Sequence, residues 1–148
     1  AVPDLLLRHC SFHGHEFDPA PAPSMSDEFP VLFVAAALAQ GRTVTSGLEE
    51  LRVKESDRLA VMAEALRRAG ARLEEREDGL AIEGTGGDPL PGAPDSQGPI
   101  ATHLDHRIAM SMAIAGHASR AGVEVDDTRP IATSFPAFES LLEGATGQ

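Results

Sequence analysis

The chain has 148 residues and a formal net charge of −11, with an isoelectric point near 4.8. This acidity argues against non-specific binding to nucleic acid or to an anionic membrane, and the absence of Tyr and Trp leaves no stacking platform for bases. A single cysteine, Cys10, excludes an internal disulfide and a multi-cysteine metal site, and it suits a reducing cytoplasm. The longest apolar run, Pro30 to Ala39, is too short to span a bilayer.

Residues 1–23 are expected to form an incoming strand and a connector. The apolar run within Val2 to Ser11 is bounded by Pro and Gly, which predicts a strand. Pro19 to Pro23 predicts a stiff, extended connector. Because the chain has no starting Met and opens directly on this strand, we expect it to be a piece of a longer protein.

A helix is predicted after the connector. Ser24 or Ser26 can cap it, and Asp27 and Glu28 then fall in its first turn, where the helix dipole favours acidic side chains. Its body, Val31 to Ala39, is apolar all round, which predicts burial on most sides.

A second helix is predicted from about Ser56 to the stop at Gly70. Apolar residues recur there at i, i+3, i+4 and i+7, the pattern of an amphipathic helix. They are Leu59, Met62, Ala63 and Leu66.

The approach to this helix, EELRVKESDRL over Glu49 to Leu59, carries an unusual charge pattern. Lys54 and Arg58 lie just before and inside the first turn, where the helix dipole makes cations unfavourable. One interpretation is that an anion lies between these cations and the exposed N–H groups. The other is that Glu55 and Asp57 neutralise the cations locally, and the pattern leaves both open.

The alternation of helices and strands predicts an α/β fold with helices layered against short sheets. The other predicted strands are Arg42 to Ser46, Ile100 to His103 and Gly122 to Val125, together with a hairpin of Ala71 to Glu75 and Leu80 to Glu83 that turns at Asp78-Gly79. The other predicted helices are one from Ile108 to about Ser119, opened by Asp105 or His106, and one capped by Ser134. Residues 85–99 are predicted as a surface loop and Gly144 to Gln148 as a frayed tail. We expect one βαβαββ-like unit over residues 24–84 and a second, partial unit over 100–148.

Three predicted helix starts carry clusters of charge. They are Asp27-Glu28, Lys54 to Arg58, and Asp105-His106-Arg107. If they converge at one rim, they form a pocket for a small, multiply anionic substrate that also needs proton transfer. If they do not, they are separate surface caps with local ion pairs of little energetic value.

A metal site is not expected. His103 and His106 flank Asp105, but no further ligand cluster accompanies them, so we favour a hydrogen-bonding role.

Four motifs in order resemble those of the EPSP synthase family, 3-phosphoshikimate 1-carboxyvinyltransferase. They are SMSDEFP (Ser24 to Pro30), LRVKESDRL (Leu51 to Leu59), THLDHRIAMS (Thr102 to Ser111) and IATSFPAF (Ile131 to Phe138). The resemblance covers nearly the whole chain but only the C-terminal third or so of such an enzyme. HLDHRIAM and the Thr-Ser before Phe135 are closer to the glyphosate-insensitive class of the family.

The resemblance implies a reaction and a fold. The family transfers the enolpyruvyl group of phosphoenolpyruvate to the 5-hydroxyl of shikimate 3-phosphate and releases phosphate, without metal or organic cofactor. Its two domains are each built from three βαβαββ units, with the active site between them. The chain would then be about two of the three units of the C-terminal domain, located in the cytoplasm, and its partner would be the missing N-terminal part of the same enzyme.

The resemblance also implies roles for individual residues. Asp27 would accept the proton of the reacting hydroxyl, and Lys54 would contact shikimate 3-phosphate and share the proton shuttling. Glu55 would be the acid/base group at the methylene carbon of phosphoenolpyruvate. Arg58 and Arg107 would hold phosphoenolpyruvate.

Three further features qualify these roles. His106 is a weaker candidate for phosphoenolpyruvate binding. Many family members carry a lysine where this chain has Thr133, which puts the contacts there in doubt. The family's Lys, Ser and additional Arg from the other domain have no counterpart here, so the chain would carry about half a site.

Two alternatives remain beside this interpretation. A related enolpyruvyl transferase acting on a nucleotide sugar would lack the RVKESDR motif. A non-catalytic interaction domain that keeps the fold would be expected to lose the charged residues at the helix starts, and all of them are present.

Overall fold

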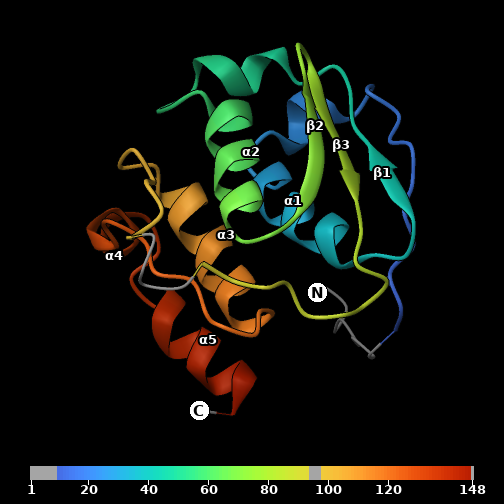
Figure 1. Ribbon diagram of the computed structural model, residues 1–148. Coiled ribbons are helices and arrows are strands. Elements are labelled where there is room, and N and C mark those ends of the chain that lie inside the picture. Colours follow the sequence, from blue (N-terminus) through green and yellow to red (C-terminus); the bar gives the residue numbers. More distant parts are fainter. Residues whose placement is uncertain (1–9, 94–97, 148) are drawn as a thin grey trace, which may run out of the picture.

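The computed structural model describes residues 10–93 and 98–147, so the predicted strand at Val2 to Ser11 lies outside the described residues except for its last two positions. Figure 1 shows helices packed beside a small sheet. The α/β class predicted from the sequence is confirmed. Within the described part of the chain, no helix is both long and apolar enough to cross a membrane.

The sheet holds three antiparallel strands in the order β1-β3-β2. They are β1 (Arg42–Val44), β2 (Arg72–Arg76) and β3 (Gly79–Glu83), close to the predicted ranges. Residues 13–16 run parallel to the far side of β1 through two isolated bridges. The sheet is thus extended by one segment, and α1 makes the parallel connection from that segment to β1.

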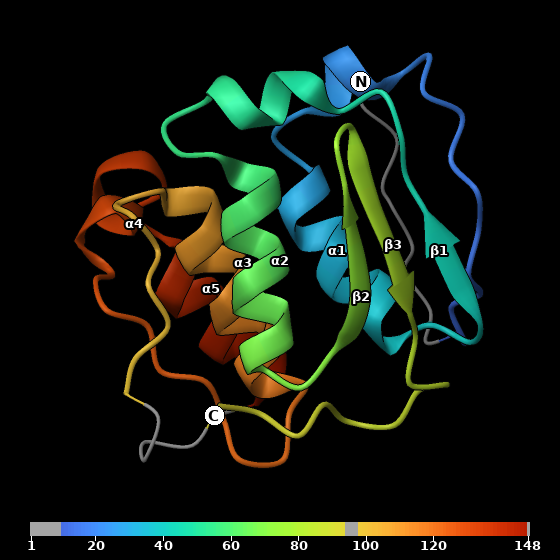
Figure 2. The ribbon, with the colours of Figure 1, turned by 45° about the horizontal axis from the view of Figure 1, so that its top comes forward.

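Helices lie on one side of the sheet in successive layers. α1 (Phe29–Leu38) and α2 (Arg58–Arg68) contact the strands, whereas α3 (His106–His117) packs on these two helices away from the sheet. Figures 1 and 2 show this order from two directions, with α4 (Arg129–Ser134) and α5 (Phe138–Thr146) beyond α3.

The core lies between the sheet and the three central helices. The amphipathic pattern of α2 is confirmed, because the four apolar residues predicted to share a face are all buried. The largest fully buried apolar side chains are Phe33, Leu48, Leu51, Leu59, Met62, Leu66, Leu80, Ile82, Leu90, Ile100 and Ile108.

The second half of the chain repeats the parallel connection on a smaller scale. Three isolated parallel bridges join Leu90 to Ser119, Ala93 to Val123 and Ile100 to Val125, and α3 lies between the two sets of paired residues in the chain. The predictions of continuous strands at Ile100 to His103 and Gly122 to Val125 are wrong. In these two stretches Ile100, Val123 and Val125 form isolated bridges and no continuous strand. The stretch predicted as a surface loop includes Leu90, which is fully buried.

Several predicted helix ends are wrong. Neither Ser24 nor Ser26 caps α1: a 3₁₀ turn, η1 (Ala22–Met25), precedes it, and Glu28 is its N-cap residue, without a side-chain hydrogen bond. Ser134 does not cap the last helix either, because it is the final residue of α4. Of the predicted frayed tail, the residues up to Thr146 are helical, and Gly147 ends α5 with a φ of 73°.

Candidate active site

The starts of the three central helices meet, as one of the two sequence hypotheses required. Arg58 is the first residue of α2 and Arg107 the second of α3, while Asp27 lies two positions before α1. Hydrogen bonds and ion pairs link all three side chains. The buried packing of α1, α2 and α3 on one another fixes where these helix starts lie.

Arg58 is the centre of this cluster. Its side chain is 1% exposed, and its guanidinium group donates to three carboxylates. Nε donates to Asp105 at 2.8 Å, Nη1 to Asp27 at 2.9 Å, and Nη2 to Glu55 at 2.5 Å. Burial alone lowers the pKa of Arg58, but the bonds and charges of these carboxylates, Asp105 foremost, raise it above its ordinary value.

Asp105 belongs to the third of the predicted charge clusters, but no individual role was predicted for it. Its carboxylate is fully buried. Oδ1 accepts a hydrogen bond from the backbone N–H of Arg107 at 2.9 Å, which is an N-cap for α3. Oδ2 accepts from Arg58 and also from the hydroxyl of Ser56 at 2.9 Å. No local pattern reveals these bonds, because 47 positions separate Arg58 from Asp105.

Asp27 bridges the two arginines. Oδ1 accepts from Arg58, and Oδ2 lies 3.3 Å from Nη2 of Arg107. The hydrogen bond from Arg58 lowers the pKa of Asp27 more than its slight burial raises it, and the charges of Arg107 and Lys54 act in the same direction as that bond. Asp27 is therefore an ionised carboxylate at neutral pH.

Lys54 and Glu55 lie on the short segment before α2 and are held differently. Lys54 Nζ bonds to Glu50 at 2.6 Å, one helical turn earlier in the 3₁₀ helix η2 (Glu49–Val53). Glu55 bonds to Arg58 while 53% of its side chain stays exposed. Lys54 therefore contributes charge near Asp27, whereas Glu55 belongs to the hydrogen-bonded cluster itself.

Arg52 and Asp57 anchor both ends of this segment. Arg52 donates to the backbone carbonyls of Glu77 and Arg76 at the hairpin tip, at 2.7 and 2.5 Å. It also bonds to Asp57, whose Oδ1 caps α2 by accepting from the N–H of Ala60 at 3.0 Å. The segment that carries Lys54 and Glu55 is thus fixed to the hairpin on one side and to α2 on the other.

The charge pattern at the start of α2 is accordingly satisfied by side chains of the protein. Glu55 neutralises Arg58, as the local interpretation predicted, but Asp57 pairs with Arg52 instead. Two carboxylates from other helix starts complete the ion pairs of Arg58. Among the described residues, one buried side-chain donor has no hydrogen-bond partner, the Nε–H of Arg107.

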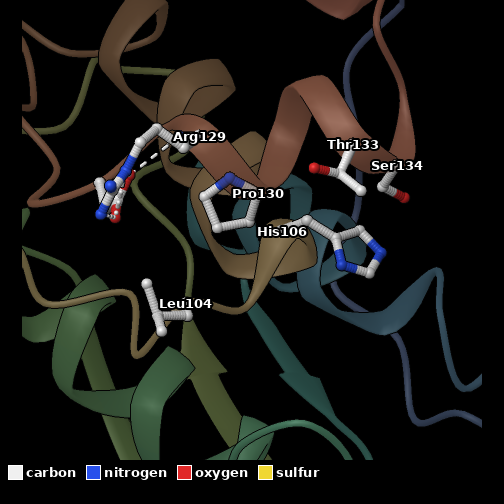
Figure 3. Close-up of a pocket in the computed structure, with 7 residues that line it drawn as sticks. Leu104, His106, Arg129, Pro130, Thr133 and Ser134 are labelled. Carbon is white, nitrogen blue, oxygen red and sulfur yellow. Dashed lines mark hydrogen bonds and ion pairs between the residues drawn. The ribbon is translucent and has the colours of Figure 1, made fainter.

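His106 faces a different hollow. A pocket of about 540 Å³ opens at the start of α3 and is lined by residues of α3, α4 and the turns before them. Figure 3 shows His106, Thr133 and Ser134 at one end of this pocket and Leu104 and Arg129 at the other. His106 is thus next to Arg107 in sequence but takes no part in the hydrogen bonds around Arg58.

The residues before α3 are unusual in their backbone. His103 and Leu104 have φ angles of 53° and 60°, in the left-handed region that non-glycine residues rarely adopt. This turn brings the chain from Thr102, which is held by Asp126, to the buried Asp105. In the described part of the chain, no group of three or more His, Cys, Asp or Glu side chains is placed to hold a metal ion.

Comparison with known proteins gives the family. The family described as "EPSP synthase (3-phosphoshikimate 1-carboxyvinyltransferase)" matches residues 9–142. A protein of Novosphingobium aromaticivorans named 3-phosphoshikimate 1-carboxyvinyltransferase is 72% identical over 145 residues, which cover 98% of this chain and 33% of that protein. A protein of the same name from Sphingopyxis alaskensis is 67% identical, over 97% of this chain and 31% of its own length.

A solved structure agrees with these sequence matches. An EPSP synthase from Acinetobacter baumannii aligns with a TM-score of 0.84 and 43% identity, over 91% of this chain and 30% of that one. The chain therefore spans about a third of the length of the curated relatives that it matches. It belongs to the EPSP synthase family.

Proposed function

We propose that this chain is part of an enzyme that transfers the enolpyruvyl group of phosphoenolpyruvate to the 5-hydroxyl of shikimate 3-phosphate and releases phosphate. One observation carries the proposal: in a member of the EPSP synthase family, Asp27, Glu55, Arg58 and Arg107 form a single hydrogen-bonded cluster. The cluster combines paired cations for an anionic substrate with carboxylates for proton transfer.

The carboxylates divide the proton traffic. Addition removes a proton from the hydroxyl oxygen and delivers one to the methylene carbon, and elimination of phosphate returns the carbon proton. Asp27, with Lys54 beside it, accepts the hydroxyl proton, and Glu55 serves the carbon. The lowered pKa of Asp27 keeps it ionised and able to accept a proton. Asp27 becomes a stronger base when the arginines form hydrogen bonds to a substrate anion in its place.

The arginines hold phosphoenolpyruvate. Arg58 is surrounded by carboxylates, so a substrate anion binds by replacing Asp27 and Glu55, which are about half exposed. This exchange also frees both carboxylates for proton transfer. The role of Arg107 is supported by its side chain, which is 34% exposed and whose Nη2 lies 3.3 Å from the half-exposed Asp27. His106, which lines the neighbouring pocket together with Thr133, is the weaker candidate for phosphoenolpyruvate binding.

The rest of the enzyme is proposed from the length of the relatives. We place residues 24–84 as one βαβαββ unit, 85–99 as a loop, and 100–148 as a partial second unit of the C-terminal domain, with 1–23 leading in. An N-terminal part supplies the other half of the site, so the chain alone is inactive. We further propose a cytoplasmic, glyphosate-insensitive enzyme that needs no cofactor.

A second candidate function is a non-catalytic interaction domain. The observation that favours it is the burial of Arg58 under three carboxylates, which is also what a purely structural arginine would show. The two candidates differ in whether the cluster exchanges carboxylates for substrate.

Phosphate release tests the proposal. Shikimate 3-phosphate and phosphoenolpyruvate are added to this chain alone, and then to this chain mixed with the upstream part of its reading frame. Phosphate released only by the mixture is the expected result. Release by the chain alone contradicts the half-site, and no release from a mixture shown to be folded and associated supports the interaction domain.

A further inference from the structure

Asp105 differs from the other two carboxylates around Arg58 in exposure and in number of bonds. It is fully buried, whereas Asp27 and Glu55 are 48% and 53% exposed. It accepts three hydrogen bonds, from the side chain of Arg58, the hydroxyl of Ser56 and the backbone of Arg107. A substrate can displace a half-exposed carboxylate from solvent, but it has no access to a buried one.

We propose that Asp105 is a positioning residue that holds Arg58 in place while Asp27 and Glu55 give way to the anionic substrate. This inference rests on the proposed function. Asp105 fixes the Nε edge of the guanidinium group and leaves the Nη1 and Nη2 edge to the exchangeable partners. An arginine held on one edge presents the other as a planar fork to a carboxylate or phosphate.

The same carboxylate sets the distance between the two substrate-binding arginines. Oδ2 holds the side chain of Arg58 from α2, and Oδ1 holds the backbone at Arg107 in α3. Ser56 adds a third bond from the segment before α2. Movement of Asp105 would therefore change the position of Arg58 relative to Arg107.

The substitution Asp105→Asn distinguishes the N-cap bond of Asp105 from its bonds to Arg58 and Ser56. Asp105→Asn keeps an oxygen that caps α3, because Asn is as good an N-cap as Asp. Its amide group cannot accept from Arg58 or Ser56, since a side-chain NH₂ only donates. The variant therefore removes the hold on Arg58 and preserves the helix start.

Hydrogen exchange measured by nuclear magnetic resonance on this chain reports how firmly Arg58 is held, and it does not require an active enzyme. In the parent chain we expect the Arg58 Nε–H to exchange slowly with water, and Asp105→Asn should speed its exchange by about tenfold or more. The backbone N–H of Arg107 should stay equally protected in both. Equal protection of Arg58 Nε–H in parent and variant would overturn the proposal.

Steady-state kinetics then tests whether the hold of Asp105 on Arg58 matters for binding of phosphoenolpyruvate. This chain replaces its matching third of the Novosphingobium aromaticivorans relative to give a chimeric enzyme. Asp105→Asn should raise the KM for phosphoenolpyruvate about tenfold or more and leave the KM for shikimate 3-phosphate unchanged. A loss of kcat with both KM values unchanged would contradict a positioning role, because it would mean that Asp105 acts in the chemical step.

Asp18→Asn is the matched control. Asp18, like Asp105, accepts a hydrogen bond from the backbone N–H two positions later, that of Ala20 at 2.9 Å, but Asp18 is exposed and lies on the segment before α1. It should leave both KM values unchanged. If the unsubstituted chimera releases no phosphate, the proposed function fails, and the exchange of Arg58 Nε–H still decides whether Asp105 positions that residue.

Ser56→Ala is a milder variant for the case in which Asp105→Asn does not fold. It removes one of the three donors to Asp105 and leaves the buried ion pair intact. We expect faster exchange of Arg58 Nε–H and a rise of about two- to fivefold in the KM for phosphoenolpyruvate. No change in either measurement would count against the proposal.

Discussion

Arg58 Nε lies 2.8 Å from Asp105 Oδ2, and neither side chain is more than 1% exposed although 47 positions separate them. Taking two charges out of water costs free energy that their attraction only partly returns. Such a pair is a weak source of net stability, but removing one partner is costly because the other charge is left buried. The pair therefore constrains the geometry between α2 and α3 more than it stabilises the fold.

Removal of Arg58 should be strongly destabilising. Arg58→Ala leaves the buried Asp105 carboxylate uncompensated, so we expect the free energy of unfolding to fall by about 3–5 kcal/mol. Urea unfolding of this chain measures it. Arg42→Ala is the matched control, since Arg42 pairs with Glu74 and Glu83 while 47% exposed, and its loss should cost about 0–1 kcal/mol. Equal losses from both variants would contradict the burial argument.

Asp27 should stabilise the protein in a pH-dependent way. Its pKa in the folded chain is lowered, chiefly by the hydrogen bond from Arg58, below the ordinary 3.8. A carboxyl of this kind stabilises the fold above its unfolded pKa, and the contribution is lost as the pH falls through the folded value. The difference in unfolding free energy between the parent and Asp27→Asn should be constant above about pH 5 and shrink below about pH 4. A difference that stays constant into the acid range would contradict this pairing.

Arg52 should control the order of the segment that carries Lys54 and Glu55. Arg52→Ala removes bonds to two backbone carbonyls and two carboxylates, so we expect a loss of about 1–3 kcal/mol and faster amide exchange over residues 49–57. Arg67→Ala is the control, because Arg67 is exposed and pairs with the same Glu75 at 3.8 Å. Unchanged exchange over 49–57 in Arg52→Ala would show that other contacts fix the segment.

Two glycines that follow β3 should respond very differently to alanine. A Cβ at Gly84 would overlap the backbone carbonyl of Ala39, which cannot move without shifting the end of α1. A Cβ at Gly86 would meet no other atom, so alanine there would be strained only by the φ angle of 77°. Thermal unfolding should show a large loss for Gly84→Ala, while Gly86→Ala should cost about 1–2 kcal/mol. Similar melting temperatures for the two variants would refute the close approach of β3 to α1.

Local pattern was sufficient where a local cause decides the structure. The apolar period placed α2 correctly, and Gly70 ends it with a φ of 93°. The hairpin turn was wrong by one residue: the turn is Glu77-Asp78, and Gly79 pairs with Arg76 inside the ladder. Gly79 is needed because a Cβ there would overlap the carbonyl of Thr45, the residue after β1, and this long-range contact is not visible in the sequence.

Other features depend on long-range contacts and could not be predicted. Ser134 was predicted to cap a helix, but it is the last residue of the short helix α4, and Pro130 lies at the start of that helix, where its missing N–H costs nothing. Asp105 was predicted as a helix start and as part of a charge cluster, but without a role of its own. Its role at Arg58 depends on the packing of α2 against α3, which no spacing within either motif encodes.

The turnover of the chimeric enzyme with Glu55→Gln, compared with Glu64→Gln, shows whether the carboxylates around Arg58 carry out the proton transfers. Glu64 is an exposed residue of α2, so the same chemical change is made outside the cluster. Glu55→Gln should lower kcat about a hundredfold or more, as for the loss of a general acid/base, while Glu64→Gln should stay within about twofold of the parent. A folded Glu55→Gln enzyme with the kcat of the parent would contradict the claim that this cluster carries out the proton transfers.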